Sequence, residues 1–353
     1  MESIFNSGLF PKGLESIRHN EEAKKILKKL AKGTQLNLIL SGPEGSGKYT
    51  LLLGYLSEIY GNKIYRKDNV KLKLNSNFEI NVKSSNFHTE IDMAKYYNHD
   101  KIIVAEYFKQ RIKSFSIEKY SDNDEIKNQR YHLIVLLGCD LLSLNAQYAM
   151  RRLMETYYKT TRFIFIVKNI NKLVQPLQSR CINVNVKTPN NYEIQKILEQ
   201  ISIFKEINIS PPKIENIVNC SNGNLKVAIS SLFISETSKD IYIDPEINDI
   251  NYICKKISSF KNELTIIYEI KDLIYSLLIK GINSNKIINI LYNYFVDFFS
   301  INNKNKIIDL TEIFAYYDSR IVNHCKDVIH FEALVYNLFS LIHNNEYFID
   351  DKC

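Results

Sequence analysis

Short apolar runs alternate with amphipathic stretches along the first half of the chain. Residues 36–40, 132–137 and 162–167 are apolar except for Asn37, His132 and Arg162, which is typical of strands buried on both faces. Residues 20–32 and 145–157 instead place apolar side chains at helical spacing. This alternation predicts a parallel sheet covered by helices on both faces.

The pattern becomes helical throughout after Pro189. Strongly apolar helices are predicted near 264–279, 286–299 and 328–342. We therefore expect three domains, and they are an α/β domain over 1–187, a small helical domain over 188–245 and a helical domain over 246–353.

Composition agrees with a soluble intracellular protein. The chain has 353 residues, 45% of them hydrophobic, which is enough to bury a core in each domain. The longest apolar run, Leu133 to Leu137, is far shorter than the ~20 residues of a membrane helix, and no signal-peptide pattern opens the chain. No membrane partner is expected.

The cysteine spacing and the net charge of the chain exclude few classes of function. The six cysteines are scattered without a Cys-x-x-Cys pair, so neither a zinc site nor a disulfide framework is indicated, and a reducing compartment is expected. The formal net charge of +7 is mild, so a nucleic-acid partner would need local clusters of basic residues.

A glycine-rich segment follows the first apolar run and resembles a phosphate-binding P-loop. In such a loop, backbone N–H groups surround the phosphates and a lysine, here Lys48, opposes their charge. The alternative is a purely structural glycine turn before a helix. The candidate nucleotide-binding residues of this segment are Gly42, Pro43, Glu44, Gly45, Ser46, Gly47, Lys48, Tyr49 and Thr50.

Two departures from the P-loop pattern concern magnesium and hydrolysis. The residue after the lysine normally holds Mg²⁺ through a small hydroxyl, but it is Tyr49 here, and Thr50 comes one residue late. The strand that ends at Leu137 is followed by Gly138, where hydrolysis requires an acidic pair. The first carboxylate is Asp140. We expect bound ATP or ADP, no metal-ligating residue and little hydrolysis.

Further motifs resemble the small subunits of replication factor C, the AAA+ clamp loaders of eukaryotes and archaea. The helix from Asn145 to Tyr157 and the later Ser179-Arg180-Cys181 resemble the family's signatures. Gly47-Lys48-Tyr49-Thr50 and the segment from Ser85 to Glu90 are similar to the ring-closing eukaryotic subunit, as are Ala315 to Arg320 and His330 to Ala333.

The resemblance implies an AAA+ P-loop domain, a helical lid domain and an all-α collar that joins the subunits. It implies that Arg180 is an arginine finger in a neighbour's ATP site, with a surface arginine capping a turn as the alternative. The resemblance places Lys226 where the family has a nucleotide-sensing arginine in its helical lid domain. It places Lys168 at the sensor position at the end of a strand, where relatives that hydrolyse ATP have asparagine. The implied partners are the other subunits of a hetero-pentamer, a sliding clamp, and primer–template DNA bound without sequence specificity.

The function expected from this resemblance is that of a clamp-loader small subunit. The setting would be a nucleus, or a viral replication factory if a virus encodes the chain. The alternatives are an autonomous P-loop ATPase and a purely structural ring subunit. Tyr316, Tyr317, Phe298 and Phe299 are expected to pack between subunits rather than to stack on bases.

Overall fold

The chain forms two compact units, Met1–Ile241 and Tyr242–Cys353, which are described separately. The domain boundaries predicted after residues 187 and 245 stay predictions. The structure is a computed structural model, and it describes residues 13–33, 35–74, 78–109, 112, 131–207, 209–237, 245–258, 264–302, 306–323 and 326–343.

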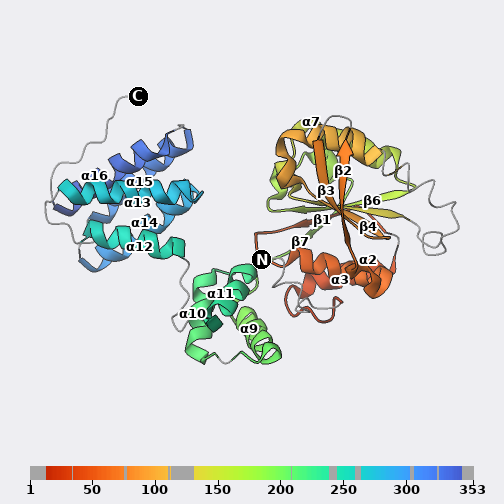
Figure 1. Cartoon of the computed structure of the whole chain (residues 1–353), viewed down its shortest axis with the longest axis horizontal. Helices are drawn as coiled ribbons and strands as arrows, with labels where there is room; N and C mark the ends of the chain where they lie inside the picture. Colours follow the sequence, from red (N-terminus) through yellow and green to blue (C-terminus); the bar gives the residue numbers. More distant parts are fainter. Residues whose placement is uncertain are drawn as a thin grey trace. The chain divides into compact units, whose positions relative to one another are not determined.

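The first unit is built on a seven-stranded sheet (Figure 1). Its order is β2-β3-β4-β5-β6-β1-β7, and the five strands from β4 to β7 in this order are parallel. The predicted parallel sheet is confirmed, while β2 and β3 add an antiparallel edge that the sequence analysis did not predict. The strands are β1 (Leu38–Ser41), β2 (Asp68–Leu74), β3 (Phe78–Ser84), β4 (His88–Asp92), β5 (His132–Leu137), β6 (Thr161–Val167) and β7 (Ile182–Asn185).

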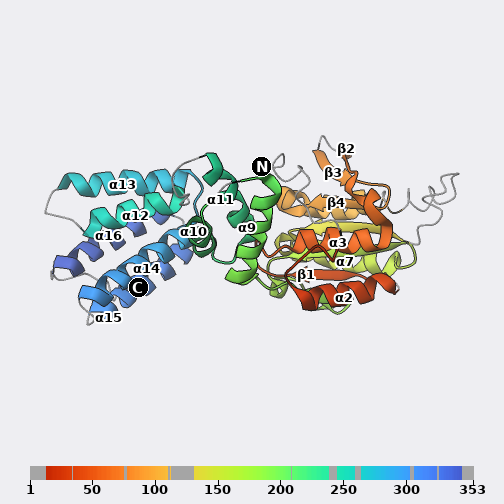
Figure 2. The ribbon, with the colours of Figure 1, turned by 90° about the horizontal axis from the view of Figure 1, so that it is seen from below.

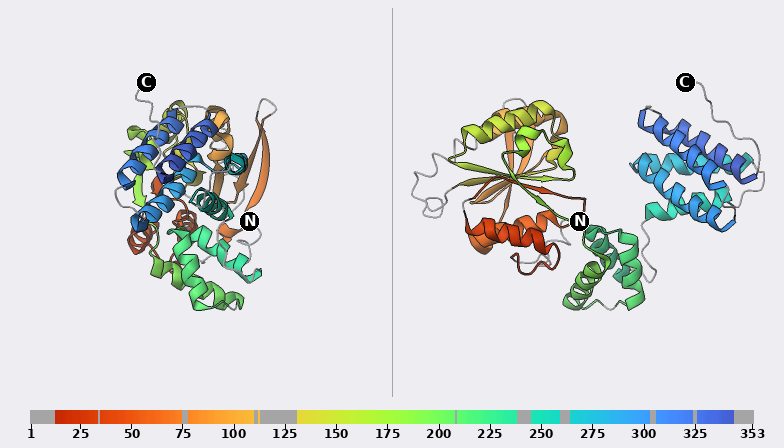
Figure 3. Two further views of the ribbon diagram at one scale, coloured as in Figure 1. Left: turned by 90° about the vertical axis from the view of Figure 1, so that its left-hand side faces the viewer. Right: turned by 180° about the vertical axis from the view of Figure 1, so that it is seen from behind.

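Helices cover both faces of this sheet (Figures 1 and 3). Leu38 and Leu40 of β1 pack into one buried cluster with α2 and α3, whereas Ile39 points into the opposite cluster with α7. This is the alternation expected of a strand buried on both faces. The elements between the strands are α2 (Glu21–Lys32), α3 (Lys48–Tyr60), η1 (Gly61–Tyr65), η2 (Met93–His99), α4 (Asp100–Ile102), η3 (Ile103–Tyr107), η4 (Cys139–Leu141), α7 (Leu144–Thr156), η5 (Ile170–Lys172) and α8 (Gln175–Gln178).

Three helices complete the first unit around a small core of their own. They are α9 (Asn191–Lys205), α10 (Pro211–Ser221) and α11 (Leu225–Thr237). Asn190 and Glu193 form a capping box at the start of α9, and α10 begins at Pro211, where the missing N–H of proline costs nothing.

In its described residues, the second unit is a bundle of five helices (Figure 2). Phe299 and Tyr317 are buried in the core of the bundle itself, so the expected packing between subunits is wrong for these two rings. Tyr316 and Phe298 are partly buried against that core, and their packing between subunits stays a prediction. The five helices of the bundle are α12 (Pro245–Ser258), α13 (Leu264–Ile279), α14 (Ser284–Asn302), α15 (Lys306–Asn323) and α16 (Asp327–His343).

No helix in the described part of the chain is long and apolar enough to span a bilayer.

Candidate nucleotide-binding site

The glycine loop lies at the carboxyl edge of the sheet, between β1 and the start of α3. The Gly42 N–H donates to the Val167 carbonyl at 3.3 Å, which fixes the loop to the end of β6. Gly47 has φ 86°, and a Cβ there would lie 2.5 Å from Nε2 of His19, so glycine is required by backbone conformation and by space. Strand, glycine loop and helix thus follow one another as phosphate binding requires.

Lys48 is folded into this loop. Its Nζ donates to the carbonyls of Gly42 at 2.6 Å and Pro43 at 2.5 Å, and the side chain is buried. Burial is the main cause that lowers the pKa of this ammonium. Ser46, also buried, donates its hydroxyl to the Pro43 carbonyl. The lysine is therefore placed where an incoming phosphate would replace carbonyl oxygens as its acceptor.

Two segments that are distant from the glycine loop in sequence contact its residues Gly45 and Ser46. His19 Nε2 lies 3.2 Å from the Ser46 carbonyl oxygen. The Leu225 N–H at the start of α11 donates to the Gly45 carbonyl at 3.2 Å, and a Cβ on Gly45 would collide with Asn224. The sequence analysis predicted neither His19 nor Asn224 as a site residue, because no local pattern distinguishes them.

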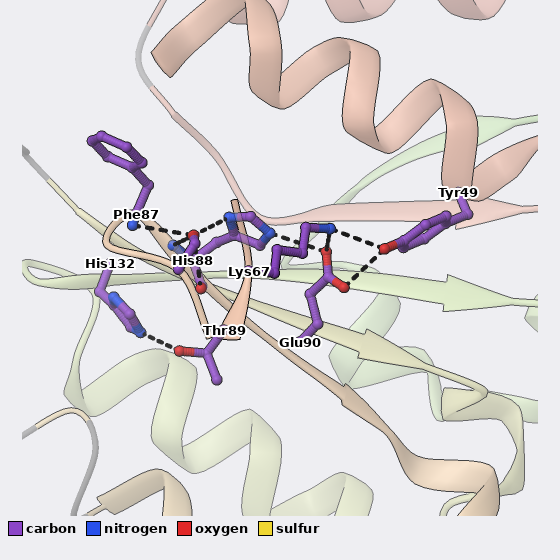
Figure 4. A network of polar contacts seen from close by, with 8 residues as sticks. Tyr49, Lys67, Phe87, His88, Thr89, Glu90 and His132 are labelled. Carbon is purple, nitrogen blue, oxygen red and sulfur yellow. Dashed lines mark hydrogen bonds and ion pairs between the residues drawn. The ribbon is translucent and has the colours of Figure 1, made fainter. Parts of the chain in front are cut away.

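Tyr49 turns its side chain into a buried polar network (Figure 4). Its phenol donates to Oε2 of Glu90 at 2.9 Å, and Lys67 Nζ donates to the Tyr49 oxygen at 2.9 Å and to Glu90 Oε1 at 2.6 Å. Together with His88 and Ser85, these residues form what we call the Tyr49 network. The phenol therefore joins α3 to β4 and the Lys67 segment.

Glu90 is the centre of the Tyr49 network. His88 donates through Nε2 to Glu90 Oε1 at 3.0 Å, while the hydroxyl of Ser85 lies 2.7 Å from His88 Nδ1. Burial by itself would raise the pKa of Glu90, but the hydrogen bond from His88 and the charge of Lys67 lower it from 4.5 to about 2. The carboxylate is thus ionised and fully occupied with protein partners at neutral pH.

The residues around the loop do not fit a bound magnesium ion. Tyr49 occupies the position of the metal-binding hydroxyl and is engaged in its network. Leu137 and Gly138 occupy the strand end where carboxylates would lie, and Gly138 has φ 69°, which disfavours any side chain there. No group of three or more His, Cys, Asp or Glu side chains that could hold a metal occurs among the described residues.

Three lysines and the carboxylates of Glu44 and Asp140 lie around the loop. Lys168 follows β6 directly, and its Nζ lies 2.7 Å from Oε2 of Glu44. That hydrogen bond is the main cause that lowers the pKa of Glu44, and the charges of Lys226 and Lys48 contribute in the same direction. Of the three lysines, the sensor-position Lys168 contacts Glu44 directly, and the predicted site residues Lys48 and Lys226 act on it through their charge. Thr50 lies half-buried in the first turn of α3.

Arg180 lies just after α8, and its guanidinium is partly exposed. Nη2 lies 2.7 Å from Oε1 of Glu155 on α7, and Nη1 donates to the Pro176 carbonyl at 2.6 Å. Arg151 also pairs with Glu155, at 3.4 Å, as its helical spacing predicts. The neighbouring Cys181 thiol has its pKa raised to about 12 by burial.

Comparison with known proteins finds replication factor C subunits that match most of this chain. Replication factor C subunit 5 of Saccharomyces cerevisiae is 29% identical over 342 residues, which cover 92% of this chain and 95% of the relative. A replication factor C small subunit of Acanthamoeba polyphaga mimivirus is 32% identical over 289 residues, which cover 80% of this chain and 76% of the relative. A solved DNA polymerase III gamma subunit-related protein of Thermotoga maritima is 11% identical, with a TM-score of 0.49, and the match covers 91% of this chain and 100% of that one. No protein-family model matches.

The parallel sheet with the P-loop after β1, followed by helical regions, defines a P-loop protein of the AAA+ class. The 32% identity to the viral small subunit shows to which family within this class the chain belongs. The chain belongs to the replication factor C small subunits.

Proposed function

We propose that this chain is one subunit of a clamp loader that uses ATP to load a sliding clamp onto primer–template DNA. Its own loop would hold ATP or ADP with little hydrolysis. Arg180 would act in trans, as an arginine finger that stabilises charge on the phosphate being transferred in a neighbouring subunit. The other subunits of a hetero-pentamer would be its permanent partners.

The observation that carries this proposal is the placement of Arg180. Within the described part of the chain, its side chain makes hydrogen bonds and an ion pair with Glu155, Pro176 and Ser179, which lie on α7 and α8 or directly after α8. None of them belongs to the chain's own P-loop. An oriented and partly exposed guanidinium is available to a neighbouring subunit, and removing such a finger lowers ATP turnover by about 10³-fold or more.

The chain's own loop supports nucleotide binding better than hydrolysis. Lys48 and the glycine turns are those of a phosphate cradle, yet Leu137 and Gly138 leave no carboxylate to orient an attacking water. This disfavours an autonomous ATPase. Lys48→Ala should therefore change the ATPase of the complex much less than Arg180→Ala.

Clamp and DNA binding are proposed from the family alone. Contacts to DNA phosphates require only lysine, arginine and helix N-termini, which the mildly basic chain can provide without base recognition. A nucleus or a viral replication factory is the corresponding setting.

A loading assay tests this proposal. The tagged chain is purified from its native source, the copurified subunits are identified, and the complex is given a sliding clamp and circular primed DNA. We expect ATP-dependent retention of the clamp on the DNA. If clamp-loader subunits copurify but the complex does not load the clamp, the chain would be only a structural subunit of the ring. A chain that purifies alone and hydrolyses ATP would contradict the proposal.

A further inference from the structure

Three lysines lie near the glycine loop, where a metal-dependent P-loop would have a divalent cation. We propose that Lys168, together with Lys48 and Lys226, takes the place of the divalent cation, so that this site holds a nucleoside diphosphate or triphosphate in its metal-free form. The inference rests on the nucleotide binding proposed above and adds how the site recognises its ligand.

Lys168 is fixed by the sheet at the right place for this role. Its preceding residue, Val167, ends β6 and accepts the Gly42 N–H, so the end of β6 lies beside the first residue of the loop. The backbone N–H of Lys168 is also 3.4 Å from Oδ1 of Asp140. From this position the side chain crosses to Glu44 on the loop, at 2.7 Å. The ammonium therefore lies at the loop that would surround the phosphates.

The groups that would bind a metal are engaged elsewhere or missing. The Tyr49 oxygen is hydrogen-bonded to Glu90 and Lys67. Leu137 supplies no oxygen. A metal-free nucleotide keeps the negative charge that Mg²⁺ would neutralise, and in this structure the compensating charge comes from ammonium groups.

In the absence of a nucleotide, the carboxylate of Glu44 provides the negative charge that pairs with Lys168. Its carboxylate pairs with Lys168 as an anionic phosphate oxygen would, and it lies within the electrostatic range of Lys48 and Lys226. Binding would exchange the Glu44 carboxylate for phosphate oxygens, with no bond made or broken. Glu44 thus acts as an internal competitor, and its removal should strengthen nucleotide binding.

This arrangement reverses the usual effect of magnesium. In a metal-dependent P-loop, Mg²⁺ bridges the protein and the phosphates and so strengthens binding. Here Mg²⁺ can only compete with the lysines for the phosphate oxygens. Added Mg²⁺ should leave the affinity unchanged or reduce it.

The experiment is a fluorescence titration of the full chain with mant-ADP and mant-ATP, in EDTA and in excess Mg²⁺. For the wild type we expect dissociation constants in EDTA that are equal to or lower than those in Mg²⁺. In EDTA, Lys168→Ala should weaken binding by about tenfold, Lys168→Arg should keep most of it, and Glu44→Gln should strengthen it a few-fold. Lys172→Ala, an exposed lysine four residues further on, is the control and should change nothing.

Three results would overturn the inference. They are a tenfold or greater gain in affinity from Mg²⁺, equal affinities of wild type and Lys168→Ala, and no binding in either condition. The first two would leave the proposed nucleotide binding standing, whereas the absence of binding would refute that binding as well. All three are distinguishable from a failure of the proposed arginine finger, because the effect of Arg180 on the ATPase of the complex does not depend on this chain's own nucleotide. Circular dichroism spectra that match the wild type would exclude misfolding as the cause of a loss.

Discussion

Nη2 of Arg180 lies 2.7 Å from Oε1 of Glu155, which joins the end of the short helix α8 to α7. Both side chains are more than a third exposed, so the pair contributes little to folding stability. Its effect is on geometry, because together with the Pro176 carbonyl it restricts a long side chain to one direction. We infer that Glu155 positions Arg180 for the role proposed for it in a neighbouring subunit.

Glu155→Gln should keep the fold and reduce the clamp- and primer-stimulated ATPase of the complex by a few-fold. The neutral amide still accepts a hydrogen bond but loses the charge-assisted one, so the guanidinium samples more directions. The loss should appear in kcat with little change in KM for ATP. Glu215→Gln, an exposed carboxylate on α10, is the control, and an unchanged kcat in Glu155→Gln would refute the positioning role.

Tyr49→Phe should destabilise the first unit by about 1.5 kcal/mol, because it deletes a hydrogen bond to the ionised carboxylate of Glu90. Urea unfolding followed by circular dichroism measures the effect. Tyr158→Phe, at a ring that is 57% exposed, should cost less than about 0.5 kcal/mol. Equal costs at the two positions would show that the Tyr49 network does not stabilise the fold.

Glu90→Gln should destabilise the protein by about 3 kcal/mol at neutral pH, because it leaves the largely buried ammonium of Lys67 beside a neutral partner. The pKa of Glu90 is lowered from 4.5 to about 2 on folding, so its contribution to stability is complete above pH 4.5 and is lost as the pH falls toward 2. The difference in unfolding free energy between wild type and variant should therefore shrink below pH 4.5. A constant difference from pH 7 to pH 3 would contradict this assignment.

Gly47→Ala should reduce mant-ADP binding by about tenfold or more. The new Cβ meets the ring of His19 at a residue with φ 86°, so both the contact and the backbone conformation are strained. Introducing His19→Ala removes the collision but not the backbone strain. The cost of Gly47→Ala should therefore be smaller in the His19→Ala background, and equal costs in both backgrounds would show that His19 does not confine the loop.

Much of the fold follows from local patterns. The run from His132 to Leu137 is β5 itself, and the helix expected over 20–32 is α2 with Asn20 and Gly33 at its ends. The edge strands β2 and β3 were missed, although Val70, Leu72, Ile80 and Val82 alternate with polar residues as half-buried strands do. Lysines and asparagines at the alternate positions made these strands less conspicuous than the continuous apolar runs.

The candidate site was predictable only in part. Gly42 to Thr50 form one continuous loop and helix start, and a motif can identify them. Lys67 and Glu90 lie 18 and 41 residues beyond Tyr49, and His19 lies 27 residues before Ser46. Such contacts come from the packing of strands and helices, which no local spacing encodes.

The most direct measurement is the clamp- and primer-stimulated ATPase of the complex copurified with this chain, with wild type compared with Arg180→Ala. Arg66→Ala, an exposed arginine after η1, is the matched control. We expect Arg180→Ala to reduce turnover by about 10³-fold while the complex stays assembled and Arg66→Ala remains active. Unchanged turnover in the assembled Arg180→Ala complex would contradict the claim that this subunit completes its neighbour's active site.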